Sequence, residues 1–313
     1  MRILDNRFFR FLTFGVGISI IGALLYHFNK NTQLLELFRK ASILKILLFC
    51  FAGFAVNTIS MAITQIAMAA SMTFKIRFFE SIALSVLTRA GNALTPFRMG
   101  TVYRAVYLKK HHQMTISQFG AIFLSLQLVM IISGSLISGI SLGMLSFEYR
   151  HIGMEIPVLL FSIFVVSSIL IFRPVTTGGD HPWFGRYMAR FLEGCRALQQ
   201  SHTSFFIAIL GRVSGLVAYT IIYYFTLREL GAETGWLSCL FLASVSSLTM
   251  LIQIIPGSLG ITETVVIFLS VHVMLPPHIG FSAALLIRLW NILFMIVLTL
   301  PSWIYLKPTR VCK

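Results

Sequence analysis

Long apolar runs alternate with short polar stretches along the chain, which is the pattern of a protein that crosses a membrane several times. A hydrocarbon core about 30 Å thick takes about twenty helical residues to cross, because each residue rises about 1.5 Å. The apolar runs of roughly this length are residues 11–28, 43–66, 116–145, 155–172, 204–227 and 280–306. Backbone polar groups that are exposed to lipid find no hydrogen-bond partner there, so a spanning segment must be a helix or a strand of a closed barrel. The runs lack the alternation of polar and apolar residues that barrel strands show. We therefore expect an all-α polytopic membrane protein with about six spanning helices.

Two segments need separate interpretation. Residues 11–28 follow three arginines, as a signal peptide would, but the apolar run is longer than a usual signal core and has no small-residue cleavage site. We expect it to be a retained helix. Residues 181–201 place Trp183, Tyr187 and Phe191 on one side and arginines elsewhere, which predicts an amphipathic helix lying in the membrane interface.

Two other apolar stretches are interrupted by the same proline and glycine pattern. The first begins near residue 78 and breaks at "PFRMG", and the second begins near residue 235 and breaks at "PGSLG". Pro256 lies 160 residues after Pro96, and Gly260 lies 160 residues after Gly100. Each break is followed by a short segment and then by a full-length span, which indicates an internal repeat. The expected repeat units are about 76–145 and 235–306, within a single domain covering residues 1–313.

Both breaks should interrupt a helix, because proline removes a backbone donor and glycine admits unusual backbone angles. The segments after the breaks, 101–112 and 261–274, would reach only about 18–21 Å as helices, which is too short to cross. We therefore expect two re-entrant broken-helix hairpins. An odd number of spans separates them, so they should form inverted repeats. Residues 235–255 are long enough to cross outright, and this alternative stays open, although it would place the basic C-terminus outside.

Composition and charge add a membrane orientation. Of 313 residues, 57% are hydrophobic and 11% are charged, whereas an ordinary soluble domain is about 25% charged. With the N-terminus inside, fourteen cationic residues fall in cytoplasmic segments and six outside, so we expect both termini in the cytoplasm. This trend accounts for the net charge of +15. A nucleic-acid-binding function is not needed to explain the charge, since the sequence shows no basic soluble module. The four cysteines are single and widely spaced, so we expect no disulfide, metal or cofactor.

Charged residues within the apolar segments are candidates for function, because a charge inside a membrane is costly unless it is paired or wet. Arg89 lies seven residues before the first proline, about 10 Å deeper in a continuous helix, and we favour a functional role for it. For Arg98, a role as a loop cation at the interface is as good an explanation as a functional role. Arg104 could be a side chain that snorkels to the headgroups. For Arg288, a structural ion pair with Glu263 competes with a role in substrate binding.

Arg212 lies eight residues into its span, where snorkelling is a sufficient explanation. Helix N-termini after a glycine break offer free N–H groups and a positive dipole end, which favour anions. Guanidinium groups bind phosphate in bidentate fashion, so we hypothesise a cavity that holds the anionic headgroup of a membrane lipid. The candidate binding residues are Arg89, Asn92, Arg98, Gly100, Thr101, Arg104, Gly257, Gly260, Glu263 and Arg288, with Pro96 and Pro256 as the structural breaks.

The two broken segments resemble the signatures of the flippase-like family named for the membrane region of lysylphosphatidylglycerol synthase. The first signature is approximately G-N-x-x-x-P-x-R-x-G-E-x-x-R-x-x-x-L, and it is matched by Gly91, Asn92, Pro96, Arg98, Gly100, Arg104 and Leu108. The second is approximately P-G-G-x-G-x-x-E, and it is matched by Pro256, Gly257, Gly260 and Glu263. The family's arginine in the last span corresponds to Arg288. Thr101 stands where the family usually has glutamate, and Ser258 replaces a glycine.

The resemblance implies a protein of a prokaryotic inner membrane that moves phospholipids, or lipid-linked phosphates or sugars, between leaflets by alternating access. Relatives translocate aminoacylated phosphatidylglycerol made by a fused synthase. The sequence shows no synthase domain, so a separately encoded lipid-synthesis enzyme is a candidate partner. Because position 101 lacks the glutamate, we expect the site to prefer a purely anionic headgroup over one with a cationic group.

Two other functions stay open at this point. One is an integral membrane enzyme acting on a polyprenyl or phospholipid substrate, although we find no spaced carboxylate pair, His-rich cluster or nucleophile motif. Asp180 and His181 lie in a Gly-Gly loop and are better explained as a turn. The other is a non-transporting partner of a lipid synthase. The identity of the lipid, the energy source and the oligomeric state do not follow from the sequence.

Overall fold

The computed structural model describes residues 42–71, 74–95, 98–148, 155–172, 202–251, 258 and 260–307. The elements in these ranges are α3 (Ile43–Ser71), α4 (Phe78–Leu94), α5 (Met99–His112), α6 (Ile116–Glu148), α7 (Glu155–Phe172), α9 (His202–Glu229), α10 (Trp236–Thr249), α11 (Ile261–Ser270), the short 3-10 helix η3 (Val271–Val273) and α12 (Pro277–Leu306). All are helical. The predicted helices at 11–28 and 181–201 lie outside the described residues.

Four of the described helices, α3, α6, α9 and α12, are long and apolar enough to cross a membrane, with 27 to 32 residues each. The helix α7 has the predicted bounds and 18 residues, so it rises about 27 Å, close to the thickness of the hydrocarbon core. Large apolar side chains on α3, α6, α7 and α12 are exposed, as they would be against lipid. The prediction of an all-α polytopic membrane protein is confirmed.

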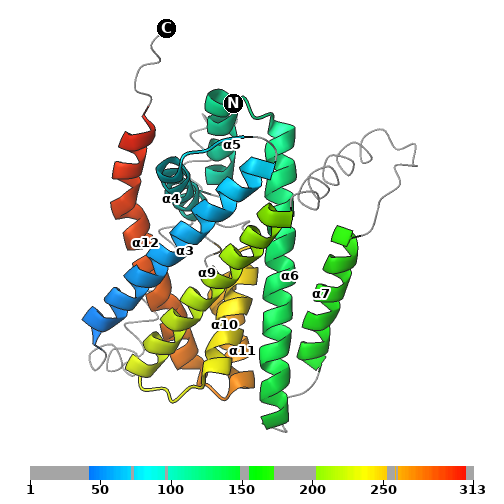
Figure 1. Ribbon diagram of the computed structural model, residues 1–313. Helices are drawn as coiled ribbons and strands as arrows, with labels where there is room; N and C mark the ends of the chain where they lie inside the picture. The colour runs from blue at the N-terminus through cyan, green and yellow to red at the C-terminus, as the bar shows by residue number, and fades with distance from the viewer. Residues whose placement is uncertain are drawn as a thin grey trace, which may run out of the picture.

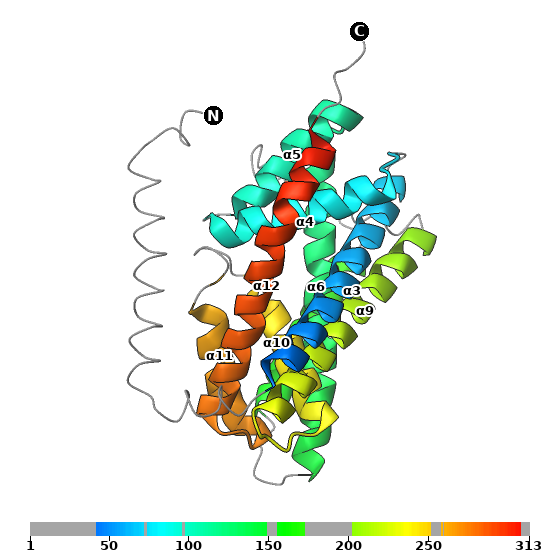
Figure 2. The ribbon, with the colours of Figure 1, turned by 90° about the vertical axis from the view of Figure 1, so that its left-hand side faces the viewer.

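The long helices surround two broken hairpins. In Figure 1, α3 and α9 run side by side, α7 packs along α6, and α12 stands on the opposite side of the bundle. In Figure 2, the hairpin α4–α5 lies near the end of the molecule where α12 ends, and α10–α11 lies near the end where α12 begins. The two hairpins therefore enter the bundle from opposite ends, as the number of intervening spans predicts. The repeat boundaries at 76–145 and 235–306 stay a prediction.

Three of the hairpin legs are too short to cross, and α4 is at the lower limit. The helix α4 has 17 residues, α5 and α10 have 14 each, and α11 has 10. The helix α10 stops at Thr249, before the predicted end at residue 255, so it rises about 21 Å and favours re-entry over a full span. Backbone angles mark both breaks, with a positive φ of 54° at Arg98, 54° at Ser258 and 83° at Gly260. Pro96, Pro256 and Gly257 lie outside the described residues.

Glycine is required where the legs of the first hairpin cross. A Cβ atom on Gly91 would lie 2.6 Å from the Cα atom of Gly100. A Cβ atom on Gly100 would overlap the carbonyl oxygen of Thr88 and lie 2.8 Å from the backbone nitrogen of Asn92. The two glycines thus let α4 and α5 approach backbone to backbone, which fixes the position of the residues that follow each of them.

Candidate lipid-headgroup cavity

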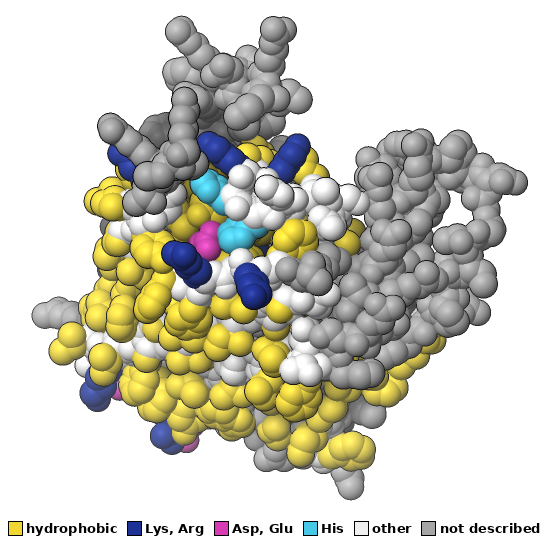
Figure 3. Space-filling model, turned by 45° about the horizontal axis from the view of Figure 1, so that its top comes forward, with side chains coloured by type: hydrophobic (Ala, Val, Ile, Leu, Met, Phe, Trp, Pro, Cys, Tyr) yellow, Lys and Arg dark blue, Asp and Glu magenta, His cyan; other side chains and the backbone are white. Residues whose placement is uncertain are grey.

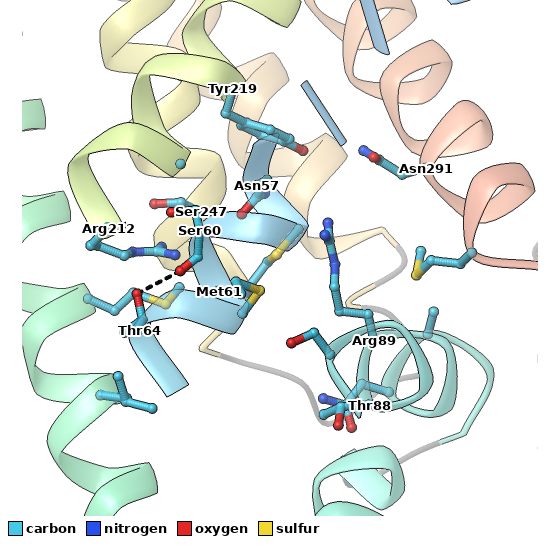
Figure 4. A pocket seen from close by; sticks show the side chains of 18 of the residues that line it. Asn57, Ser60, Met61, Thr64, Thr88, Arg89, Arg212, Tyr219, Ser247 and Asn291 are labelled. Atoms are coloured by element: carbon cyan, nitrogen blue, oxygen red, sulfur yellow. Dashed lines mark hydrogen bonds between the residues drawn. The ribbon is translucent and has the colours of Figure 1, made fainter. Parts of the chain in front are cut away.

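A cavity of about 270 Å³ lies in the middle of the helix bundle. It is lined by residues of every described helix except α7 and η3, and polar side chains from α3, α4, α9 and α12 point toward it (Figure 4). Among its described lining residues, the charged ones are five arginines and a single glutamate. They are Arg89, Arg98, Arg104, Arg212, Arg288 and Glu263. The cavity is therefore strongly positive.

Arg89 lies on α4 and extends into the cavity, below Tyr219 in the view of Figure 4. Its Nη1 atom donates a hydrogen bond of 3.1 Å to the hydroxyl of Thr58, and its guanidinium lies 4.6 Å from the centre of the Phe54 ring. Both partners belong to α3 and neither carries a negative charge. The structure places Arg89 in the cavity, where the functional interpretation put it.

Arg98 joins the two hairpins. Its Nη2 atom donates hydrogen bonds of 2.7 Å to the carbonyl oxygens of Met250 and Leu251, directly after α10. The last carbonyls of a helix have no partner within the helix and carry the negative end of its dipole, so they attract a cation. The guanidinium also lies 5.6 Å from the centre of the Phe123 ring on α6. Arg98 is thus more than a loop cation at the membrane surface.

Arg104 is buried, with 8% of its surface exposed. Its guanidinium lies 5.7 Å from the centre of the Phe119 ring on α6, and its Nε atom has no hydrogen-bond partner among the described residues. A snorkelling arginine would direct its head to the membrane surface instead. The snorkelling interpretation of Arg104 is therefore wrong, because α5 turns this side chain toward the inside of the bundle.

Asn92 caps the helix α5 from the neighbouring leg α4. The backbone N–H of Thr101 donates to Oδ1 of Asn92 at 3.1 Å, and Nδ2 of Asn92 donates to the hydroxyl of Thr101 at 3.2 Å. This is the role of an N-cap side chain, supplied here by a different helix. The sequence-based expectation of free N–H groups at the start of α5 needs correction, because Asn92 already occupies the N–H of Thr101.

Glu263 and Arg288 form an ion pair at the other hairpin. Nη1 of Arg288 on α12 donates to Oε1 of Glu263 on α11, and Oε2 of Glu263 accepts the backbone N–H of Gly260 at 2.9 Å. Glu263 thereby caps its own helix at the third position, where a carboxylate is favourable. The N–H of Gly260 that was expected to face an anion is therefore occupied. Arg288 therefore forms the structural ion pair and also lines the cavity.

Arg212 is a cavity residue that the sequence analysis assigned to snorkelling. Figure 4 shows its side chain extending from α9 into the cavity near Ser60 and Thr64 of α3. The hydroxyl of Ser60 donates to the carbonyl of Gly211, and a Cβ atom on Gly211 would overlap the hydroxyl oxygen of Thr64. This close packing turns Arg212 inward. The signal was available in the sequence, because small residues flank the arginine at Gly211 and Gly215 and favour helix contact over lipid.

A second polar cluster lies at the open end of the first hairpin, outside the cavity. Nε2 of His112 lies 2.7 Å from Oε1 of Glu80, and the hydroxyl of Tyr107 donates to the same oxygen at 3.1 Å. Burial works to raise the pKa of Glu80, but the hydrogen bonds from His112 and Tyr107 outweigh it and hold this pKa below its ordinary value of 4.5. Figure 3 shows basic, acidic and histidine side chains gathered on this end of an otherwise largely hydrophobic surface.

The chemistry of the cavity suits ligand binding. Within the described ranges, no group of three or more His, Cys, Asp or Glu residues is placed to hold a metal ion. The lining offers guanidinium groups, hydroxyls such as those of Thr88 and Tyr219, and the amides of Asn57 and Asn291. These are mainly hydrogen-bond donors of the kind that bind phosphate oxygens.

The comparison with known proteins agrees with this architecture. The family described as Lysylphosphatidylglycerol synthase TM region matches residues 10–299. The matched range contains both broken hairpins and every residue that lines the cavity. No curated protein and no solved structure gave a significant match. The chain therefore belongs to the family of the lysylphosphatidylglycerol synthase TM region.

Proposed function

We propose that this protein moves a lipid with a phosphate-bearing, anionic headgroup between the two leaflets of a prokaryotic inner membrane. The observation that carries the proposal is the charge of the cavity, whose described lining residues include five arginines and one glutamate. Desolvating a charge inside a membrane costs several kcal/mol, and such charges are kept where they contact a substrate or each other. An anionic headgroup would supply the missing counter-charge.

The location of the cavity favours a lipid over a soluble anion. The helices around it expose long apolar faces, so the acyl chains can stay in the bilayer while the headgroup occupies the polar interior. Arginine also suits phosphate geometrically, because its planar guanidinium presents two parallel donors to two phosphate oxygens.

The hairpin arrangement supports transport over static binding. Broken helices that enter from opposite ends and meet beside a cavity are the architecture of alternating-access transporters. Here α4–α5 and α10–α11 approach each other at the hydrogen bonds of Arg98 with Met250 and Leu251. Rearrangement at this contact would open the cavity toward one leaflet and then toward the other.

A leaflet-sidedness assay tests the proposal. Purified protein is reconstituted into vesicles with a headgroup-labelled anionic phospholipid, and the fraction accessible to an external quencher is followed over time. We expect transport by the wild type and a decrease of tenfold or more for Arg89→Ala and Arg104→Ala, because each removes a charge-assisted contact of about 1.5–3 kcal/mol. Arg228→Ala is the matched control, since Arg228 is an exposed arginine outside the cavity.

Three outcomes would contradict the proposal. Wild-type rates in both cavity variants would exclude the arginines from the substrate path. A chemical change in the labelled lipid would indicate an enzyme. An unchanged lipid that also stays in its original leaflet, for every anionic lipid tested, would indicate a non-transporting partner of a lipid synthase.

A further inference from the structure

The five arginines of the cavity differ in how their charges are compensated. Arg288 is paired with Glu263, and Arg98 donates to two backbone carbonyls. For Arg89, Arg104 and Arg212, no carboxylate lies within ion-pair distance in the described part of the chain. Among the described residues, three guanidinium groups of the cavity therefore have no counter-charge.

These three groups come from different walls of the cavity. Arg104 lies over Phe119 of α6, whereas Arg89 contacts Phe54 and Thr58 of α3. Arg212 extends from α9 into the space that Arg89 also faces (Figure 4). Arg89 and Arg212 both carry a positive charge and line the same cavity. A ligand that reaches all three must carry its negative charge on several oxygens.

Two of the three groups have unsatisfied donors. The Nε atoms of Arg104 and Arg212 are both buried and have no hydrogen-bond partner among the described residues. A buried donor without a partner is destabilising, and more so when it is charged. Arg104 is itself more than nine-tenths buried, so bulk water does not compensate it. An occupant with oxygen acceptors would satisfy both donors.

The cavity also excludes a cationic group on the headgroup. The carboxylate lining it in the described ranges is Glu263, and its two oxygens already accept from Arg288 and Gly260. An amine on the ligand would thus add a fourth uncompensated positive charge. The headgroup that fits has negative charge and no cationic partner for it.

We infer that the cavity selects headgroups with two or more negative charges, of the phosphomonoester or diphosphate class, and that Arg212 is one of the residues that impose this selection. A phosphodiester brings one negative charge and leaves two of the three guanidinium groups uncompensated. A phosphomonoester brings about 1.5 to 2 negative charges near pH 7, because its second pKa is about 6. This inference rests on the proposed function and adds the charge class of the lipid.

Binding of matched lipids to the full-length protein in detergent tests the inference. Phosphatidic acid, phosphatidylglycerol and phosphatidylcholine with identical acyl chains are compared at pH 7.5 by the shift in thermal unfolding or by native mass spectrometry. We expect phosphatidic acid to bind tenfold or more tightly than phosphatidylglycerol, which corresponds to about 1.4 kcal/mol for one extra charge-assisted contact. Phosphatidylcholine should bind most weakly.

The pH dependence separates ligand charge from other headgroup features. At pH 5 phosphatidic acid is mostly a monoanion, so its advantage over phosphatidylglycerol should shrink severalfold. The other titratable groups lining the cavity are Glu263, Tyr219 and Tyr223, and phosphatidylglycerol, whose own charge does not change between pH 5 and pH 7.5, reports any contribution from them. An advantage that is equal at both pH values would overturn the inference.

Variants of the cavity arginines show which residues impose the preference for phosphatidic acid. Arg212→Gln and Arg104→Gln should each reduce the preference for phosphatidic acid to about threefold or less, whereas Arg212→Lys should reduce it less, because it keeps the charge and loses only the parallel donors of the guanidinium. Arg228→Gln, at an exposed arginine outside the cavity, should behave as wild type. Thermal unfolding without lipid identifies any variant that fails to fold, and in that case the pH dependence of the wild type still tests the role of charge. An Arg212→Gln variant that folds and keeps the full preference overturns the role of Arg212.

The other outcomes of the binding experiment distinguish a failure of this inference from a failure of the proposed function. Equal and tight binding of phosphatidic acid and phosphatidylglycerol would overturn the charge selection and leave the transporter proposal intact. Binding of both no tighter than phosphatidylcholine would overturn both. Soluble pyrophosphate distinguishes the source of the anion, because competition at millimolar concentration supports recognition of the headgroup, whereas binding as tight as that of the lipid would overturn the assignment to a lipid.

Discussion

At Gly100 the helix α5 lies against the carbonyl oxygen of Thr88 and the side chain of Asn92, with no room for a Cβ atom. Gly100→Ala should therefore force the hairpin legs apart and destabilise the protein by about 1–3 kcal/mol, as overpacking usually does. Thermal unfolding in detergent measures the effect. Gly120→Ala on α6 is the control, because a Cβ atom there meets nothing within 4 Å, and it should be neutral or slightly stabilising.

The ion pair of Glu263 with Arg288 gives a second prediction at this scale. Glu263→Gln leaves the partly buried Arg288 without this carboxylate, and breaking a buried pair from one side typically costs about 3–5 kcal/mol. The double variant Glu263→Gln with Arg288→Met should recover much of this loss, since neither charge then remains. Equal stabilities of the single variant and the wild type, measured by thermal unfolding, would show that the pair contributes little to the fold.

Single residues also show what the sequence could and could not reveal. The positions of Arg89 and Gly100 followed from their distance to a helix break. Arg212 was misjudged because its depth in the span was considered without its glycine neighbours, which bring α9 against α3. The contact of Asn92 with Thr101 joins two helices across a break, and no periodicity within one helix predicts it.

At the scale of elements, the first hairpin is closed by the contact of Glu80 on α4 with His112 and Tyr107 on α5. Because the folded state holds the pKa of Glu80 below 4.5, its stabilising contribution is present above that pH and is lost as the pH falls through the lowered pKa. The protection of α4 and α5 against hydrogen exchange, relative to the intrinsic rate at each pH, should therefore decrease on acidification below about pH 4. Glu80→Gln should remove this pH dependence, and a variant that keeps it would locate the titrating group elsewhere.

Helix boundaries were predictable where lipid alone decides them. The spans at 43–66, 116–145, 204–227 and 280–306 all lie within α3, α6, α9 and α12, because about twenty apolar residues have one way to satisfy their backbone in a membrane. The leg at 235–255 was ambiguous, since its composition also permits a full span. Its end at Thr249 depends on contacts with α11, such as the hydrogen bond of Thr249 with Thr262 at 2.8 Å, and these are tertiary.

At the scale of the whole molecule, Arg98 holds the two hairpins together through Met250 and Leu251. Arg98→Ala removes two charge-assisted hydrogen bonds of about 1.5–3 kcal/mol each, so the end of α10 and the start of α5 should exchange amide protons faster. Mass-resolved hydrogen exchange in detergent measures this, with Arg228→Ala as the control. Unchanged exchange at both segments would mean that other contacts set the relative position of the hairpins.

The opposite orientation of the two hairpins was predictable by counting spans. The set of helices that together line the cavity was not. Its lining comes from helices that are up to about 240 residues apart in the sequence, from Asn57 to Met295. Charge density in the sequence indicated that such a site exists, because buried arginines need a counter-charge. Which arginines share the site depends on helix packing, and the glycines beside Arg212 were the sequence signal for its share in the site.

Native mass spectrometry of the protein extracted from its own membrane identifies the lipid that stays bound to it. We expect the wild type to retain an anionic, phosphate-bearing lipid and the combined variant Arg89→Gln, Arg104→Gln, Arg212→Gln to lose it. Retention of the same lipid to the same extent by a folded combined variant, or a wild type that carries only zwitterionic lipid, would contradict the binding of an anionic headgroup by these arginines.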